Sequence, residues 1–186
     1  MSRHAHFLIG AGCFWKTEAA YRFLHGVDLT EVGYIALPPD EGAMPVLSSV
    51  ADAHRVWRVE VLAVKIDLDV LPLARFMDVF WLTHTATEQW DLGDVDFMSC
   101  RSVLVVPDPD LRAEVTALVA ERRATHSVKT RVFAQAAYLR AADSEQDFFV
   151  RHPEDSYSTT QVLPCLKKLW DAMPEQMDLE DGSALA

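Results

Sequence analysis

Cys13 lies where a glycine-rich turn meets the start of a predicted helix, and this position could make it a nucleophile. In the stretch LIGAGCFWK, glycines precede the cysteine, and two aromatic residues and Lys16 follow it. The free N–H groups and positive dipole end of a helix N-terminus stabilise a thiolate, and a nearby lysine adds positive charge. Phe14 and Trp15 would form an apolar wall beside the sulfur, which suits attack on a small, weakly polar electrophile.

A buried, unreactive thiol is the alternative interpretation of Cys13, because free cysteines often pack as small apolar side chains. The chain has two other cysteines, Cys100 and Cys165, and all three lie far apart. An odd number of widely spaced cysteines does not indicate a disulfide scaffold. We therefore expect free thiols in a reducing, cytoplasmic compartment, with any disulfide transient or catalytic.

The composition argues against nucleic-acid and membrane partners. The 186 residues carry a net charge of −11, from 28 acidic and 17 basic residues, without a basic run. Such a surface repels nucleic acid and anionic lipid. No apolar run reaches the roughly 18 residues of a membrane span, and the opening MSRHAHFLIGAG lacks the long apolar region of a signal peptide.

Hydrophobic periodicity and turn residues predict an α/β fold with helices packed on a mixed sheet. No shift in composition marks a second domain, so we expect one domain over residues 1–186. The pattern predicts strands at 5–9, 28–37, 56–66 and 102–106, and helices at 13–24, 72–84 and 108–124. Beyond about residue 141 we expect irregular chain, apart from a helix near 162–170.

The motif around Cys13 resembles the opening of the peptide methionine sulfoxide reductase A family. Matching residues in this motif and the strand after it are Gly12, Cys13, Phe14, Trp15, Glu18, Gly33 and Tyr34. Weaker similarities follow in the same order at His54, Phe80, Trp81, His84, Arg101 and Ser102, so the likeness spans about residues 6–106. The resemblance implies a two-layer α+β sandwich whose mixed sheet has a ferredoxin-like core.

The resemblance also implies a mechanism. The Cys13 thiolate would attack a sulfoxide sulfur and become a sulfenic acid, while Phe14 and Trp15 hold the substrate's methyl group. A glutamate and two tyrosines of the family bind and protonate the leaving oxygen. Cys100 or Cys165 would resolve the sulfenic acid, with thioredoxin as the external reductant and no cofactor.

Ungapped counting from the matching motifs places other residue types at the oxygen-handling positions. Val56 falls on the family's glutamate, and Met44 and Cys100 fall on its two tyrosines. Asp94 and Asp96 flank the position of the family's aspartate, and a slip of one residue would supply one of them. Because these groups act on the oxygen, we expect the pocket and its substrate to differ from those of the family.

Two functions therefore stand as alternatives. The first is a thiol-dependent oxidoreductase of the peptide-methionine (S)-S-oxide reductase type, acting on a peptidyl or small-molecule sulfoxide or on a related oxidised sulfur or selenium centre. The second is a non-catalytic binding protein that keeps the fold but has lost the oxygen-protonating residues; two-cysteine chemistry on an unrelated electrophile is a weaker third. The histidines His4, His6, His54 and His84 lack a companion Cys-x-x-Cys pair, so we expect no metal site.

Overall fold

The computed structural model describes residues 3–37, 57–86 and 101–178, and within these residues six strands form one sheet. The strand order is β5-β4-β1-β3-β2-β6, and every neighbouring pair is antiparallel except the parallel pair β4–β5. The strands are β1 (His4–Ala11), β2 (Val27–Leu37), β3 (Trp57–Asp67), β4 (Ser102–Val105), β5 (Arg131–Phe133) and β6 (Ala137–Arg140). The sheet is therefore mixed, as the sequence predicts.

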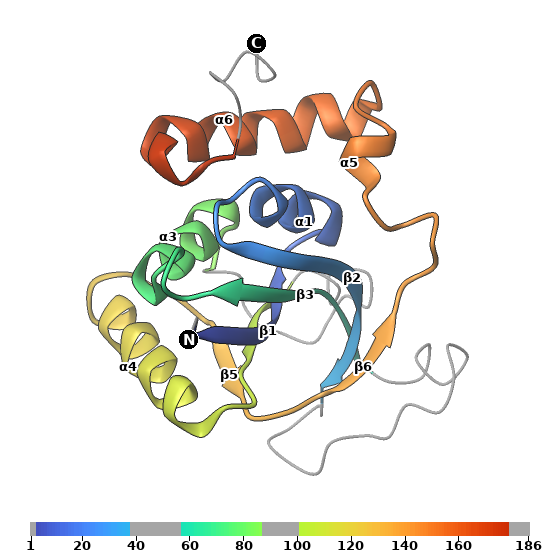
Figure 1. The fold of residues 1–186 in the computed structure, drawn as a ribbon. Coiled ribbons are helices and arrows are strands. Elements are labelled where there is room, and N and C mark those ends of the chain that lie inside the picture. Colours follow the sequence, from blue (N-terminus) through green and yellow to red (C-terminus); the bar gives the residue numbers. More distant parts are fainter. Residues whose placement is uncertain (1–2, 38–56, 87–100, 179–186) are drawn as a thin grey trace.

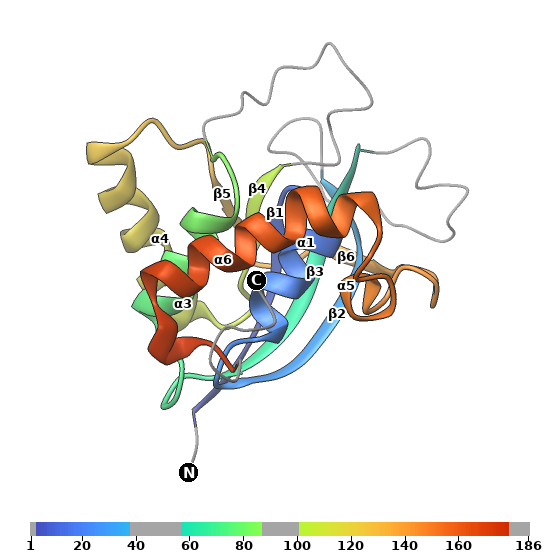
Figure 2. The same cartoon turned by 90° about the horizontal axis from the view of Figure 1, so that it is seen from above.

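Helices α1, α3 and α4 cover one face of this sheet, and α6 lies over α1 and α3 on the side away from the sheet (Figures 1 and 2). The helical elements are α1 (Phe14–Arg22), α3 (Leu73–Thr83), α4 (Pro109–Thr125), α5 (Phe148–Arg151), the π-helix η2 (Ser158–Val162), α6 (Leu163–Ala172) and the 3₁₀ helix η3 (Pro174–Gln176). Contacts of α6 with both α1 and α3 bring the C-terminal segment against the N-terminal half of the chain.

The elements from β1 to β4 form the ferredoxin-like core that the family resemblance implies. Strands β4, β1, β3 and β2 are adjacent in that order, and α1 and α3 make the two crossovers. Alternation along the strands sends one set of side chains toward the helices, among them Phe7 and Ile9 of β1 and Leu62 and Val64 of β3. Burial of this apolar face against the helices is the main force that holds β1 and α1 in place.

The chain after residue 141 is largely helical, which corrects the expectation of an irregular C-terminal region. Residues 148–176 contain α5, η2, α6 and η3 in succession. Only α6 has an apolar stripe long enough to be recognised by periodicity, because α5 has four residues and η2 has five. Strands β5 and β6, with three and four residues, also lack a pattern long enough to be predicted.

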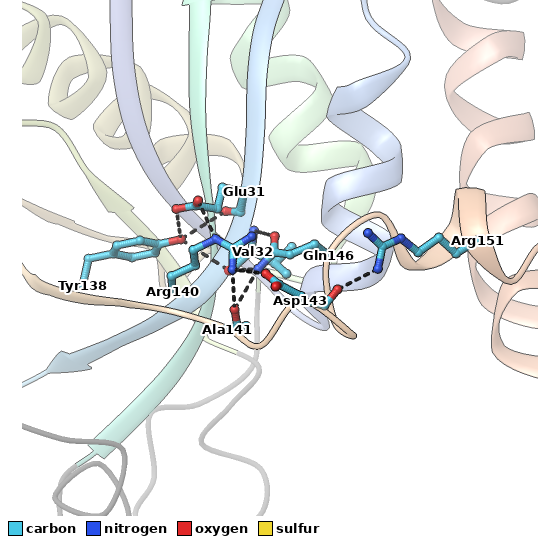
Figure 3. Close-up of polar contacts among 8 residues, drawn as sticks. All are labelled: Glu31, Val32, Tyr138, Arg140, Ala141, Asp143, Gln146 and Arg151. Carbon is cyan, nitrogen blue, oxygen red and sulfur yellow. Dashed lines mark hydrogen bonds and ion pairs between the residues drawn. The ribbon is translucent and has the colours of Figure 1, made fainter.

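A polar network fastens the start of this C-terminal segment to β2 (Figure 3). The buried Gln146 side chain donates to the Val32 carbonyl at 2.9 Å and accepts from the Val32 N–H at 2.8 Å. On β6, the Tyr138 hydroxyl and the Arg140 guanidinium both donate to the Glu31 carboxylate, at 2.9 and 2.8 Å. These bonds hold the chain against β2 just before it continues into α5, which lies beside α1.

Candidate active site

Cys13 is the N-cap of α1, directly after a turn that glycine permits. Strand β1 ends at Ala11, and Gly12 has a φ of +88°, a conformation that L side chains rarely adopt. The Cys13 side chain is half-buried and is a free thiol. The backbone N–H groups of Trp15 and Lys16, in the first turn of α1, lower the pKa of the thiol, which is the effect of a helix start that the sequence predicts.

The Cys13 thiol nevertheless has a pKa above its ordinary value. Burial raises this pKa most, a hydrogen bond from the Tyr157 hydroxyl lowers it, and the Glu60 charge raises it again. The N–H groups of the helix start lower it less than burial raises it. Cys13 therefore rests as a thiol near neutral pH, and a reaction through its thiolate requires a nearby proton acceptor.

Glu60 supplies a carboxylate beside Cys13 that the ungapped count does not find. It lies on β3, and its Oε2 accepts a hydrogen bond from the Phe14 N–H at 3.0 Å, one residue beyond the cysteine. The ungapped count predicts Val56 at the position of the family's glutamate, and it does not single out Glu60. Val56, which the count placed at this position, lies outside the described residues. A glutamate within the β-rich run VWRVEVLAVKI was the available signal.

The two aromatic residues after Cys13 have different surroundings. Phe14 is buried in the core against Tyr34, with ring centroids 5.4 Å apart. Trp15 stacks flat on Phe148 of α5, with centroids 3.7 Å apart and planes at 9°, and Tyr157 meets it edge-on at 5.6 Å. The chain after residue 141 thus reaches the site, although the sequence motifs did not indicate this.

A cavity of about 470 Å³ opens at Cys13 between α1, the end of α3 and the C-terminal segment. Its lining residues are Gly12, Cys13, Lys16, Leu82, Thr83, His84, Thr85, Tyr157 and Lys168. Phe14 and Trp15 are not among them, so their predicted contact with a substrate methyl group stays a prediction. The cavity instead offers a thiol, a phenol, an imidazole and two ammonium groups to a ligand.

His84 is a fixed, neutral wall of this cavity. Its Nδ1 lies 2.7 Å from the Phe80 carbonyl, so Nδ1 carries the proton, and Nε2 accepts from the Ser102 hydroxyl at 2.8 Å. The Ser102 hydroxyl in turn lies 2.7 Å from that of Thr130. Burial, and to a smaller extent the nearby Lys16 charge, lower the pKa of His84 to about 4, although the hydrogen bond to the Phe80 carbonyl acts in the opposite direction. His84 therefore does not act as an acid near neutral pH.

Glu18 connects α1 to the C-terminal segment. The residue is 2% exposed, and its Oε2 accepts from the Asp147 N–H at 2.9 Å. Burial and the neighbouring Asp147 charge raise the pKa of Glu18 to about 7. Asp147 also pairs with Arg22 and has a φ of +56°. This contact fixes the residue immediately before Phe148 and so sets the ring that stacks on Trp15.

Of the remaining predicted site residues, one lies in the described part of the structure and four do not. Cys165 is a half-buried free thiol on α6, where burial raises its pKa and the charges of Lys16 and Lys168 lower it. The remaining candidates lie outside the described residues, and they are Met44, Asp94, Asp96 and Cys100. No group of three or more His, Cys, Asp or Glu side chains that could hold a metal occurs within residues 3–37, 57–86 and 101–178.

Comparison with known proteins agrees with the sequence motifs. The family model described as peptide methionine sulfoxide reductase matches residues 5–177, well beyond the stretch that the motifs span. The peptide methionine sulfoxide reductase MsrA of Psychrobacter cryohalolentis is 29% identical over 163 residues, covering 87% of this chain and 92% of the relative. The MsrA of Natronomonas pharaonis is 26% identical over 174 residues, covering 91% and 96%.

Solved structures show the same fold. Mxr1 from Saccharomyces cerevisiae in reduced form matches with a TM-score of 0.65 at 21% identity, covering 82% of this chain and 88% of that chain. Methionine sulfoxide reductase A of Corynebacterium diphtheriae matches with a TM-score of 0.63 at 18% identity, covering 81% and 76%. The fold and the family match together define an oxidoreductase of the methionine sulfoxide reductase type. The chain belongs to the peptide methionine sulfoxide reductase family. None of the helices that the structure describes is both long and apolar enough to span a membrane.

Proposed function

We propose that the chain is a thiol-dependent methionine sulfoxide reductase in which Cys13 is the nucleophile. The observation that carries this proposal is the position of the Cys13 thiol, at a helix start and on a cavity, with a carboxylate and a phenol beside it. Membership of the family supports the reaction class. Lys16 and the neutral His84 line the same cavity and would position the substrate.

In the proposed reaction the Cys13 sulfur attacks the sulfoxide sulfur and receives its oxygen. The substrate sulfur gains two electrons and leaves as a thioether, and Cys13 loses two electrons and becomes a sulfenic acid. The thiol proton must leave before the attack, because the thiolate is the nucleophile. The Glu60 carboxylate is the proton acceptor that we assign to this step, since its charge acts directly on Cys13.

A second thiol completes the proposed cycle by reducing the sulfenic acid. Cys165 and Cys100 are the candidates for an internal resolving cysteine, whose attack would give a disulfide with Cys13 and release water. Thioredoxin is the external reductant that we propose, in a reducing cytoplasm. Mxr1 of Saccharomyces cerevisiae, which shares the fold at a TM-score of 0.51, is solved in complex with Trx2 and supports this choice. Peptide mapping of the protein oxidised by one equivalent of sulfoxide identifies the resolving cysteine.

Binding without catalysis is the alternative function. The raised pKa of the Cys13 thiol favours it, because a thiol at neutral pH is a weak nucleophile. The Glu60 carboxylate beside the sulfur favours the enzyme instead. The substrate class within the enzyme proposal spans peptidyl and small-molecule sulfoxides and related oxidised sulfur or selenium compounds.

One assay separates these functions. Wild-type protein and Cys13→Ser are incubated with dithiothreitol and each epimer of a methionine sulfoxide substrate, both free and in a peptide. We expect the wild-type protein to reduce the S epimer and the serine variant to lose this activity by at least about 10³-fold, because the hydroxyl cannot replace the thiolate. Absence of turnover on all substrates, with Cys13 unreactive toward a sulfenic-acid probe, overturns the enzyme proposal.

A further inference from the structure

We propose that the Cys13 cavity selects sulfoxides that carry a carboxylate close to the sulfur, and that Lys16 and Lys168 bind this carboxylate. The inference rests on the proposed function and names the substrate class of the same site. Its basis is a local positive charge on a protein whose net charge is −11. The two lysines set specificity through binding of the substrate and take no part in the exchange of oxygen.

Lys16 reaches the cavity from the first turn of α1. It lies three residues after Cys13, and residues three apart are neighbours on one side of a helix. Its Nζ lies 4.0 Å from the position that a Cβ would take on Gly12, beside the turn before the cysteine. Burial has the largest effect on the pKa values of His84 and Cys165, and the Lys16 charge lowers both. The ammonium therefore acts on groups from three sides of the cavity.

Lys168 brings a second ammonium to the cavity from α6. Its Nζ donates to the Leu82 carbonyl at 3.0 Å, which holds the side chain against the end of α3. An ammonium has three donors, so this bond leaves two for a ligand. Within residues 3–37, 57–86 and 101–178, neither Lys16 nor Lys168 forms an ion pair with an Asp or Glu side chain. Both charges are therefore available to an anionic ligand.

Negative charge near the cavity is smaller than this positive charge. No Asp or Glu is among the described residues that line the cavity, and His84 is neutral near pH 7. The nearby Glu60 carboxylate is not part of the lining and accepts from the Phe14 N–H at 3.0 Å. Charges elsewhere on the surface are screened over about 8 Å at physiological ionic strength. A carboxylate inside the cavity therefore meets a net attraction, although the protein as a whole is acidic.

The size of the cavity suits a substrate that carries both a sulfoxide and a carboxylate. Its volume of about 470 Å³ lies within the roughly 300–1,000 Å³ of small-molecule sites. A C-terminal methionine sulfoxide supplies a carboxylate only a few carbon atoms from its sulfur, and an acidic residue after the sulfoxide supplies one slightly farther away. An internal methionine sulfoxide between neutral residues supplies none. We therefore expect the cavity to distinguish these peptides by charge.

Steady-state reduction of three matched peptides tests this preference. They are an acetylated alanine–methionine sulfoxide dipeptide with a free carboxylate, its C-terminal amide, and an amide in which aspartate follows the sulfoxide. We expect kcat/KM for the free acid to exceed that for the neutral amide by about tenfold, because two partly exposed ammonium groups attract it. The aspartate peptide shows whether a neighbouring acidic side chain can replace the C-terminal carboxylate.

Substitution of the two lysines tests the assignment of this preference. Lys16→Gln and Lys168→Gln should each reduce the acid-to-amide ratio of kcat/KM to about threefold, and the double variant should abolish the preference. The loss should come from a higher KM for the acid with little change in kcat, because binding of the carboxylate does not change during the reaction. Lys65→Gln is the matched control, since it removes an ammonium that pairs with Asp28 at 3.2 Å, and it should keep the wild-type ratio.

Alkylation of Cys13 measures the charge of the cavity without turnover. Iodoacetate and iodoacetamide attack the same thiolate, so the ratio of their rates does not depend on the pKa of the thiol. Peptide mass spectrometry follows the reaction at Cys13. We expect this ratio to be about fivefold above that of N-acetylcysteine amide, and to fall to the value of this model thiol in the double variant or at high salt.

The outcomes separate this inference from the function on which it rests. An active protein that reduces the acid and the amide equally, or whose preference persists in the double variant, overturns the inference and leaves the proposed function intact. A protein without turnover on any sulfoxide overturns the proposed function. The alkylation ratio then decides the anion-binding role of Lys16 and Lys168, and a ratio equal to that of the model thiol overturns it.

Discussion

Two walls of the Cys13 cavity are built in different ways. We call residues 12–16, at the start of α1, the N-terminal wall, and residues 147–168, from α5 to α6, the C-terminal wall. The N-terminal wall continues directly from a central strand into a helix whose inner face is buried, including Ala20 and Tyr21 at 0% exposure. Its position therefore follows from the main hydrophobic core.

The C-terminal wall depends instead on a few identifiable contacts. Glu18 holds Asp147, Phe148 stacks on Trp15, and Lys168 donates to a carbonyl of α3. Each such contact contributes about 1 kcal/mol or slightly more. Cys13, the proposed nucleophile, is therefore held in place by the core of the fold, whereas the opposite wall of the cavity is held by separable side-chain contacts. Substitutions can therefore change one wall without the other.

The largest expected effect concerns the carboxylate behind the N-terminal wall. Glu60→Gln should lower the single-turnover rate of sulfoxide reduction by about 10²–10³-fold, because the thiol loses its proton acceptor. The same change should lower the pKa of Cys13, since the Glu60 charge raises it, so iodoacetamide alkylation near pH 8 should become faster. Opposite changes in the two rates are the expected signature. Glu114→Gln, at an exposed position on α4, is the control, and a parallel fall in both rates would contradict the prediction.

The next effect is a pH dependence of stability from Glu18, which joins the two walls. Its pKa is about 7 in the folded protein and near 4.5 in the unfolded chain, so protonation stabilises the fold at low pH. That contribution is complete below about pH 4.5 and is lost as the pH rises through 7. After allowance for solvent screening, Glu18→Gln should equal the wild-type protein at pH 4 and exceed its free energy of unfolding by about 2 kcal/mol at pH 8.

Urea unfolding at a series of pH values measures this difference. Glu121→Gln, exposed on α4, should leave the pH dependence of the wild-type protein unchanged. A difference between Glu18→Gln and the wild-type protein that does not vary with pH would contradict the prediction, because it would show that the pKa of Glu18 is the same in the folded and unfolded states.

The smallest expected effect concerns the aromatic stack between the walls. Phe148→Ala removes the ring that lies on Trp15, and aromatic pairs contribute about 0.5–1.5 kcal/mol. Because Trp15 also holds Tyr157, we expect kcat for the sulfoxide to fall about fivefold. Phe149→Ala is the matched control, since that ring meets Phe23 at 6.1 Å instead. Similar kcat values for the two variants would show that the stack of Phe148 on Trp15 does not affect the reaction rate.

The sequence predicts the part of the fold that is built from long periodic segments. Strands β1 to β4 and helices α1, α3, α4 and α6 follow the predicted ranges within a few residues. Shorter elements such as β5, β6 and α5 are set by tertiary hydrogen bonds, including those of Gln146 and Tyr138, and leave too little local pattern.

The residues of the candidate site differ in the same way in how well the sequence predicts them. Cys13 stands at its predicted helix start because a motif of adjacent residues specifies the turn and the helix. Glu60 and Tyr157 come from distant segments, and the length of the chain between motifs decides their register, which ungapped counting cannot supply. Which residues of distant segments meet at the site becomes predictable only when the register of the strands is known.

The π-helix η2 makes the direction of the Tyr157 side chain sensitive to insertions and deletions. It contains the five residues Ser158–Val162, between Tyr157 and the start of α6. One residue more or fewer in such a turn rotates the flanking segments relative to each other by about 100°. Loss of a single codon here would turn the phenol away from the thiol and leave α1 and the sheet intact. One small deletion would thus remove the phenol from the Cys13 cavity, without a new fold and without any change to Cys13.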